Sequence, residues 1–177
     1  MTKKRGKIME IKQIGLKNLA ELQKISRITF ADTFGAENSD EDMKKHLDTA
    51  YSSSQLTTEI DNPNSFFYFG YVNGKLAGYL KLNVDDAQSD DEGQNCLEVE
   101  RIYILPDFKR QGLGSKLIEV AEQIAKAKHK SEIWLGVWEG NPAAIAFYQA
   151  KGFCRTGQHV FTLGNDRQTD YIMKKRV

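Results

Sequence analysis

The stretch Ile104-Leu-Pro-Asp-Phe-Lys-Arg-Gln-Gly-Leu-Gly-Ser115 decides the fold class of this 177-residue chain. Residues 97–104 alternate like a strand that ends at a proline, and residues 114–130 repeat apolar side chains at helical spacing. Between them lies a basic turn with two glycines, where free N–H groups and the positive end of the helix dipole converge on an approaching anion. The stretch therefore predicts a strand–turn–helix unit of an α/β fold, and an anion site with Lys109 and Arg110 at its rim.

Two common nucleotide-binding patterns do not fit this turn. The dinucleotide pattern G-x-G-x-x-G and the Walker pattern G-x-x-x-x-G-K-[ST] both require glycine at position 117, where this chain has leucine. The anion is therefore expected to bind in another way. The alternative is a glycine-containing turn whose basic side chains are merely solvated.

The rest of the chain alternates between strand-like and helix-like segments. Strands are expected at residues 8–14, 66–72, 76–84, 97–104, 132–138, 153–163 and 168–175. Helices are expected at residues 16–34, from the N-cap Ser39 onward, at 56–60, at 114–130 and at 142–150. Asn73-Gly74 and Gly164-Asn165-Asp166 supply turns, and the polar residues 85–95 form a loop. This order predicts an α/β (α+β) chain with a mixed sheet and helices packed on it.

The composition fits one globular domain spanning residues 1–177, with residues 1–7 as a flexible extension. Twenty-five basic and 24 acidic residues give a net charge of +1, so no charge excess attracts nucleic acid or an anionic membrane. No apolar run reaches the roughly 18 residues that span a bilayer, and no hydrophobic stretch follows the basic start, so no signal peptide is expected. Two distant cysteines favour free thiols in the cytoplasm, Cys154 as a small buried side chain, and no metal-ligand spacing is present.

A second motif follows the strand at 132–138. Its sequence is Asn141-Pro-Ala-Ala-Ile-Ala-Phe-Tyr-Gln-Ala-Lys-Gly-Phe153. Together with Lys109-Arg-Gln-Gly-Leu-Gly114 it resembles the GCN5-related N-acetyltransferase (GNAT) superfamily, whose members carry an R/Q-x-x-G-x-G/A pyrophosphate motif and an N-x-x-A-x-x-F-Y segment. Lys109 stands where arginine or glutamine is usual. The resemblance implies the GNAT fold, a mixed, mostly antiparallel twisted sheet of six to seven strands with helices on both faces, and acetyl-CoA as the acetyl donor.

Five further segments are similar to the bacterial PaiA-type spermidine/spermine N-acetyltransferases of this superfamily. They are Phe30–Phe34, Asn83–Ser89, Glu100–Ile104, Ile133–Glu139 and Gln168–Met173. This similarity implies a cytoplasmic enzyme that moves an acetyl group directly to a primary amine, in the first place a polyamine such as spermidine or spermine. A peptide or protein amine, or another small amine, stays open as the acceptor, as does a non-catalytic regulator that senses acyl-CoA. The superfamily often forms homodimers, and direct binding to nucleic acid or membranes is not expected.

The resemblance also implies which residues bind the donor. The backbone of Ile102, Tyr103 and Ile104 is expected to pair with the pantetheine arm like an added strand. The pyrophosphate is expected on the turn formed by Lys109, Arg110, Gln111, Gly112, Leu113, Gly114 and Ser115. Asn141 is expected to hydrogen-bond the cofactor arm, and Lys151 to meet the adenosine phosphate.

Acetyl transfer to an amine also needs proton transfer. Deprotonating an ammonium group whose pKa is about 10.4 costs roughly 4.6 kcal/mol at about pH 7, so a base is needed near the acceptor. Period-two alternation puts Glu98 and Glu100 on one face of their strand, together with Ile102 and Ile104. The resemblance favours Glu100 as the base, with Glu98 as the second candidate, and Tyr148 as the general acid for the coenzyme A thiolate. The alternative is that both glutamates are solvated or ion-paired and that the tyrosine belongs to the aromatic core.

A polyamine site should combine carboxylates with apolar walls, because these acceptors are flexible polycations. Asp85 and Asp86 open an acidic stretch, residues 85–92, that contains no Lys or Arg. Asp32, between two phenylalanines, lies in the helix–loop region that roofs the acceptor in the superfamily. These three aspartates are the candidate acceptor residues. The alternative for each acidic run is a solvated loop.

Overall fold

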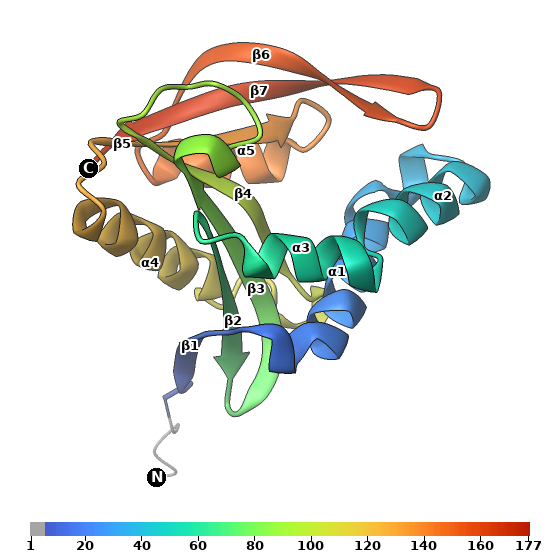
Figure 1. Cartoon of the computed structure of the whole chain (residues 1–177), viewed down its shortest axis with the longest axis horizontal. Coiled ribbons are helices and arrows are strands. Elements are labelled where there is room, and N and C mark those ends of the chain that lie inside the picture. The colour runs from blue at the N-terminus through green and yellow to red at the C-terminus, as the bar shows by residue number, and fades with distance from the viewer. Residues whose placement is uncertain (1–5) are drawn as a thin grey trace, which may run out of the picture.

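A computed structural model of the chain describes residues 6–177, which form one open, twisted sheet with helices on both faces (Figure 1). The strands are β1 (Met9–Gln13), β2 (Ser65–Val72), β3 (Lys75–Val84), β4 (Cys96–Ile104), β5 (Glu132–Trp138), β6 (Cys154–Leu163) and β7 (Asp166–Arg176). They lie in the order β1-β2-β3-β4-β5-β7-β6, and only the β4–β5 pair is parallel. The expected mixed, mostly antiparallel sheet is confirmed, with seven strands.

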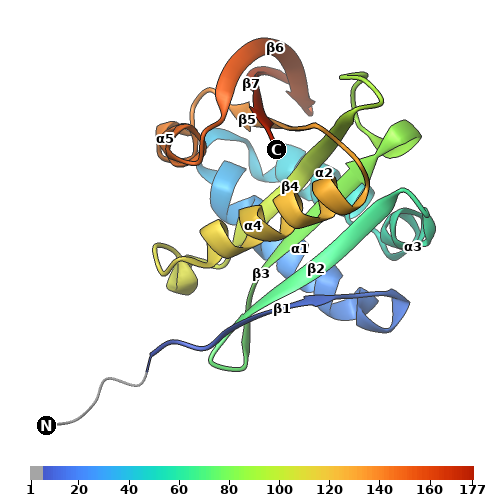
Figure 2. The same ribbon diagram turned by 90° about the vertical axis from the view of Figure 1, so that its left-hand side faces the viewer.

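Helices cover both faces of the sheet in the described part of the chain. The α-helices are α1 (Leu19–Phe34), α2 (Asp40–Ala50), α3 (Ser53–Asp61), α4 (Leu113–Ala127) and α5 (Pro142–Ala150), and single 3-10 turns lie at Leu16–Asn18, Gly35–Glu37, Asp85–Ala87 and Pro106–Phe108. Figure 2 shows α4 on one face of β2–β4 and α1 on the other. The hydroxyl groups of Ser39 and Ser52 accept hydrogen bonds from the first turns of α2 and α3, and each such cap stabilises its helix by about 1 kcal/mol.

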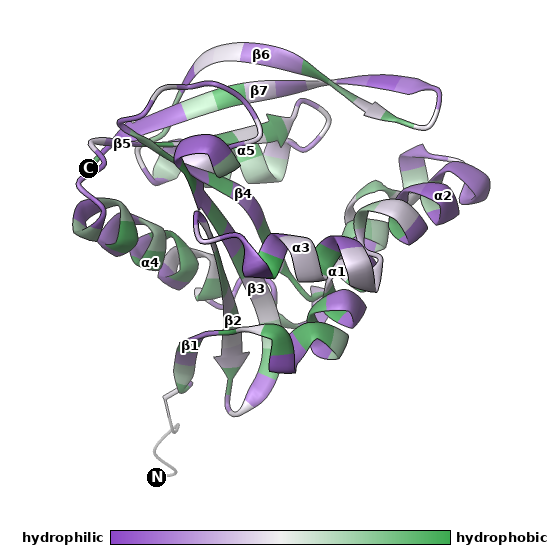
Figure 3. Cartoon of the chain, viewed as in Figure 1, coloured by the Kyte–Doolittle hydropathy of each residue, from purple (hydrophilic) through white to green (hydrophobic). Residues whose placement is uncertain are grey.

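Two large hydrophobic clusters, one on each face, hold these layers together. Along α4, hydrophobic and hydrophilic residues alternate in Figure 3, as expected of a helix that buries one side. In β3, Leu80 packs in the cluster that contains Leu117 of α4, whereas Tyr79 packs in the cluster that contains Leu22 of α1. Because both faces are covered, both alternating sets of side chains in this strand are buried. Full burial of each leucine contributes about 1.5–3 kcal/mol, which is why the central strands read as continuous apolar runs.

The parallel pair in the middle of the sheet separates after three residues. β4 pairs with β5 only over residues 96–98, against residues 132–134, while it remains paired with β3 as far as Ile104. On its β5 side, the second half of β4 therefore has no strand partner within residues 6–177. This gap leaves main-chain donors and acceptors free in the interior of the fold.

A β-bulge in β4 changes the faces that alternation predicted. The pairing with β3 skips Glu100, so the strand contains one extra residue at this point. Glu98 and Glu100 stay together, because the amide of Asn83 donates to both. Ile102 and Ile104 instead pack in the cluster on the α4 face. The expectation that all four share a face was wrong, because an inserted residue shifts the period-two pattern by one.

Three smaller expectations also differ from the structure. α4 ends at Ala127 instead of near residue 130, and the polar segment 85–95 opens with a single 3-10 turn. Cys154 was expected to be buried but is exposed, because β6 is an edge strand of the sheet. The proposed extension, residues 1–7, falls largely on residues 1–5, which lie outside the described residues. Within the described residues, no helix combines the length and the apolar character needed to cross a membrane.

Candidate active site

The turn before α4 presents a row of free backbone donors. The N–H of Lys116 is the first to donate back into the turn, to the carbonyl of Gly112 over 3.2 Å. For the N–H groups of residues 110–115, the described part of the chain provides no hydrogen-bond acceptor. Gly112 has φ +94°, a left-handed conformation that favours glycine and lets the chain enter the helix here. Donors gathered at the positive end of a 15-residue helix fit a pyrophosphate group.

The side chains of this turn are held by its surroundings. The ammonium group of Lys109 lies 2.9 Å from the carboxylate of Asp32, at the end of α1. The side chain of Gln111 donates to the carbonyl of Asp107 over 2.9 Å and so braces the turn. Asp32, expected at the acceptor, is therefore bound to the predicted pyrophosphate turn, and Arg110 remains as the second basic group of its rim.

Helix α5 packs directly against the first turn of α4. A Cβ atom at Gly114 would lie 3.2 Å from Cζ of Phe147, so the glycine permits this approach, and Leu113 beside it is fully buried. Tyr148 is buried next to Phe147 and Phe153, with ring centroids 5.3 and 5.9 Å apart. Burial raises the pKa of the Tyr148 phenol. The phenol therefore keeps its proton at neutral pH.

The remaining predicted donor-binding side chains lie at the ends of α5 and in the first turn of α4. The side-chain oxygen of Asn141 accepts from the N–H of Ala144 over 3.2 Å and caps α5, so only its NH₂ group is left for a ligand. Lys151 ends the helix, with its ammonium group 5.8 Å from the ring centre of Phe147. Ser115 is half-buried beside the free N–H groups.

The backbone of Ile102, Tyr103 and Ile104 lines the gap between β4 and β5. One edge of this segment pairs with β3, and the other edge faces the gap. An extended chain such as a pantetheine arm can hydrogen-bond to an open strand edge of this kind. This segment thus has an open edge toward β5, and its pairing with a pantetheine arm stays a prediction.

Glu100 belongs to a buried network of charges. The ammonium group of Lys81 lies 2.5 Å from Glu100 and 3.2 Å from Glu59, and the guanidinium group of Arg101 lies 3.3 and 2.7 Å from the same two carboxylates. Burial alone would raise the pKa of Glu100, but Arg101 and Lys81 hold it below its ordinary value. Glu100 is therefore ionised and well partnered, which makes it a weak proton acceptor.

Glu98 is buried, and no Lys or Arg side chain of residues 6–177 forms an ion pair with it, so hydrogen bonds hold its carboxylate instead. It accepts from the backbone N–H of Ser89 over 2.8 Å, from the hydroxyl of Ser89, and from the amide of Asn83 over 2.9 Å. Burial, together with neighbouring Glu100, raises the pKa of Glu98, although these hydrogen bonds oppose the shift. The contacts with Ser89 also tie the acidic loop to β4.

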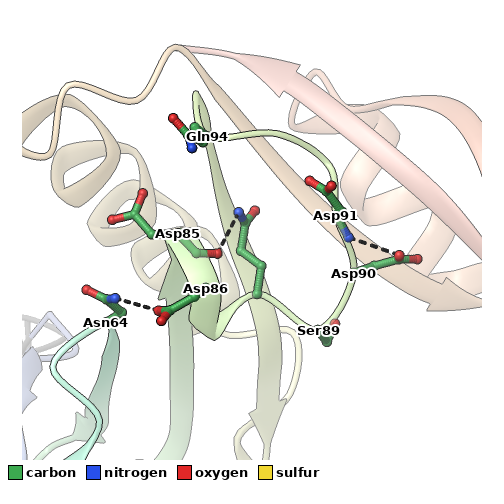
Figure 4. A pocket seen from close by; sticks show the side chains of 8 residues that line it. Asn64, Asp85, Asp86, Ser89, Asp90, Asp91 and Gln94 are labelled. Atoms are coloured by element: carbon green, nitrogen blue, oxygen red, sulfur yellow. Dashed lines mark hydrogen bonds between the residues drawn. The ribbon is translucent and has the colours of Figure 1, made fainter.

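Asp85 and Asp86 lie together at an open depression of about 820 Å³ (Figure 4). Its lining consists of Asn64, Asp85, Asp86, Gln88, Ser89, Asp90, Asp91 and Gln94. Asp85 lies 2.6 Å from the ammonium group of Lys130, and Asp86 accepts from the amide of Asn64 over 2.6 Å. Neither Asp32 nor any predicted donor-binding residue lines this depression. The structure thus joins two of the predicted acceptor aspartates to each other, and the third to the pyrophosphate turn.

Sequence reasoning missed the partners of the strand glutamates. Lys81 and Asn83 are polar positions within the apolar run of β3, a pattern that signals a buried polar contact. Glu59 of α3 carries no comparable signal. Asp170 of β7 was also missed, although it lies inside the family-like segment Gln168–Met173.

The chain is similar in sequence and in structure to known proteins. A sequence model described as the Acetyltransferase (GNAT) family matches residues 22–153, from α1 to the end of the α5 motif. The chain belongs to this family. It is a GNAT N-acetyltransferase, and acetyl-CoA, whose pyrophosphate fits the donors before α4, is its acetyl donor. Among residues 6–177, no three His, Cys, Asp or Glu side chains gather as a metal ion would require.

This GNAT enzyme has relatives that match nearly its whole length. An uncharacterized N-acetyltransferase from the pepI 3' region of Lactobacillus delbrueckii subsp. lactis is 51% identical over 167 residues, 94% of this chain and 96% of the relative. A spermidine N(1)-acetyltransferase of Thermoplasma acidophilum is 24% identical over 172 residues, 95% of this chain and 97% of the relative. The crystal structure of PaiA N-acetyltransferase from Thermoplasma acidophilum with coenzyme A is similar with a TM-score of 0.78 and 25% identity, covering 96% of this chain and 99% of that one.

Proposed function

We propose that this GNAT enzyme transfers the acetyl group of acetyl-CoA directly to a primary amine of a polyamine such as spermidine or spermine. The observation that carries the proposal is a face that combines negative charge with aromatic walls. Asp170 lies opposite Trp138 in the strand register, and the Trp138 ring packs against Phe34 of α1 at a centroid distance of 5.5 Å. Carboxylates beside aromatic rings suit a flexible chain of ammonium groups and methylenes. The relative named as a spermidine N(1)-acetyltransferase supports the same acceptor class.

Acetyl-CoA, when bound, supplies an acetyl group activated as a thioester. The free N–H groups of residues 110–115 would hold its pyrophosphate, with Lys109 and Arg110 adding positive charge. The open edge of β4 would align its pantetheine arm, and a main-chain N–H near Ile102 would polarise the thioester carbonyl. Tyr148 would donate its proton to the leaving thiolate, since its phenol stays protonated at neutral pH.

The acceptor must lose a proton before its nitrogen can attack. Of the two strand glutamates, Glu98 is the better acceptor, because its pKa is raised by burial whereas that of Glu100 is held down by Arg101 and Lys81. Hydrogen bonds to both oxygens of Glu98 weaken it in turn. Glu100 instead stays ion-paired with Lys81 and Arg101.

The test is an amine-panel assay that follows thiol release from acetyl-CoA. The panel contains spermidine, spermine, a diamine, free lysine and a peptide with a free N-terminus, and product mass and position are determined for each. We expect the highest kcat/KM with spermidine or spermine. Turnover of the peptide amine without turnover of any polyamine would overturn the polyamine proposal. Tight coenzyme A binding with no turnover on any amine would instead favour a regulator that senses acyl-CoA.

A further inference from the structure

A row of three titratable side chains, Asp170, His159 and Asp90, leads from β7 through β6 to the acidic loop. Asp170 of β7 lies opposite both Trp138 of β5 and His159 of β6 in the strand register. Nε2 of His159 lies 3.5 Å from Oδ2 of Asp170, and Nδ1 lies 3.5 Å from Oδ2 of Asp90, in the acidic loop. The exposed fraction of the side chains rises along the row, from 17% for Asp170 to 30% for His159 and 47% for Asp90. The row therefore connects the interior with solvent.

The inner end of this row lies on the acceptor face. A Cβ atom at Gly136 would lie 3.4 Å from Oδ2 of Asp170 and 3.4 Å from Cε1 of His159, so the pair lies directly over the β5 backbone. Trp138, two residues further along β5 and thus on the same face, packs against Phe34 of α1. The pair therefore lies on the face of the sheet that α1 covers, beside the gap where β5 has left β4.

The charge of Asp170 also affects the pKa of Tyr103. Burial, in the first place, and then Tyr79 raise the pKa of the Tyr103 phenol, and the charges of Tyr148 and Asp170 add to this shift. Tyr103 belongs to the stretch of β4 that borders the gap. Asp170 is therefore one of the charged groups that act on Tyr103, a residue of the stretch of β4 that borders the gap.

One carboxylate oxygen of Asp170 accepts no hydrogen bond from the described residues. Oδ1 of Asp170 and Nδ1 of His159 are buried and, within residues 6–177, lack a hydrogen-bond partner. Burial raises the pKa of Asp170, and His159 opposes the shift. A buried acceptor without a donor is costly unless a ligand supplies one, and an ammonium group brings three N–H donors.

We propose that Asp170 binds the ammonium group of the acceptor, and that His159 takes up its proton and releases it to solvent beside Asp90. The proposal rests on the proposed amine acetylation and adds to it two catalytic residues and an exit for the proton. Asp90, at the exposed end of the row, acts as a positioning residue for the imidazole.

Atoms and charges balance in this step. One N–H bond of the ammonium group breaks, the proton moves to Nε2 of neutral His159, and the electron pair stays on nitrogen. That pair forms the new bond to the carbonyl carbon while the bond from carbon to sulfur breaks, and Tyr148 protonates the thiolate. The tyrosinate regains a proton from the second N–H of the new amide, and the imidazolium of His159 loses its proton to water. The sum is amide, free thiol and one released proton.

The step requires a neutral imidazole, so the rate depends on pH. The titratable groups near the imidazole are Asp90 from the acidic loop and Asp170 from β7, and Asp170 in turn acts on Tyr103 of β4. For the wild-type enzyme we expect kcat/KM for spermidine to fall on the acid side as the imidazole becomes protonated.

The experiment compares His159→Gln, His159→Ala and Asp170→Asn with the full-length wild-type enzyme, using spermidine and acetyl-CoA. We expect each variant to lower kcat/KM by about 10²- to 10⁴-fold while acetyl-CoA binding and the thermal midpoint stay close to wild type. His159→Gln should remove the acid limb of the pH profile, and added imidazole should restore part of the rate of His159→Ala. Asp166→Asn, an exposed position on the same strand, is the matched control and should leave kcat/KM unchanged.

Each other result has a definite meaning. Wild-type rates and an unchanged acid limb in folded His159→Gln and Asp170→Asn would overturn the inference while leaving polyamine acetylation standing. If Glu98→Gln loses the acid limb of the pH profile while His159→Gln retains it, Glu98 is the group that accepts the proton of the ammonium group, and the inference is likewise overturned. Absence of turnover by the wild-type enzyme on every amine would overturn both this inference and the proposed function.

Discussion

Replacing Lys81 with methionine tests the buried charge network on which the bulge of β4 rests. The ammonium group lies 2.5 Å from Glu100 and 3.2 Å from Glu59, and the side chain is only 6% exposed. Methionine keeps the length and the apolar stem of lysine, so Lys81→Met removes the charge with little change in packing. Two buried carboxylates would then share Arg101 as their remaining cation in the network.

The expected loss of stability follows from this burial. Removing one partner of a buried ion pair costs about 3–5 kcal/mol, because the other charges are left uncompensated. A domain of this size has a total stability of about 5–15 kcal/mol. At about 2–4 °C per kcal/mol, Lys81→Met should lower the thermal midpoint by roughly 6–20 °C.

The loss should also depend on pH. Burial raises the pKa of the Glu59 and Glu100 carboxyls. The positive charge of Arg101, with that of Lys81, outweighs burial and holds both pKa values below the ordinary value. A carboxyl with a lowered pKa contributes stability that is complete above its ordinary pKa and is lost as pH falls through the folded-state value. The penalty of Lys81→Met should therefore be largest at neutral pH and shrink in acid, where protonated carboxyls no longer need a cation.

Urea unfolding followed by circular dichroism, at neutral pH and in acid, measures both effects. Lys44→Met is the matched control, because the same substitution removes a surface pair in which the lysine is 78% exposed. This control should leave the unfolding midpoint unchanged within error. A penalty for Lys81→Met below about 1 kcal/mol at neutral pH, or one that does not vary with pH, would refute the reasoning.

Three further substitutions test the site and its scaffold. Tyr148→Phe should slow acetyl transfer by about 10²- to 10⁴-fold and leave acetyl-CoA binding, measured by calorimetry, nearly intact; an unchanged rate would remove the phenol from its proposed role. Gly112→Val forces a β-branched residue into φ +94°, so it should cost about 1–3 kcal/mol in urea unfolding and weaken acetyl-CoA binding, and wild-type affinity would contradict the donor row. Gly78→Ala would place a Cβ atom 2.7 Å from the carbonyl oxygen of Tyr103, so the free energy of unfolding should fall by about 1–3 kcal/mol; an unchanged free energy would mean that β4 shifts freely there.

The order of strands and helices could be predicted because it depends on local patterns. Ser39 and Ser52 cap α2 and α3 with their own hydroxyls, and Asn73-Gly74 turns the β2–β3 hairpin with both residues at positive φ. The free N–H groups of the turn from Lys109 to Ser115 could likewise be predicted from this segment alone, because the first N–H groups of any helix have no partner within the helix. These features need only a few neighbouring residues.

The faces of β4 could not be predicted in the same way. Period-two alternation assumes regular pairing, and the extra residue at Glu100 exists only because β3 pairs on either side of it. Burial of Lys81 likewise depends on Glu59, which α3 brings from 22 positions earlier in the sequence. A long-range partner of this kind leaves no mark within the segment that it neutralises.

The sequence by itself determined the fold class and the family resemblance, and it predicts an anion site at the start of α4, because capping, hydrophobic periodicity and glycine conformation act over a few residues. Only the tertiary structure decided which carboxylates are free to act. It pairs Glu100 with Lys81 and Arg101, binds Asp32 to Lys109, and sets Asp170 beside His159. The charge and pKa of a side chain depend on the groups within a few ångströms, and those groups come from segments that only folding brings together.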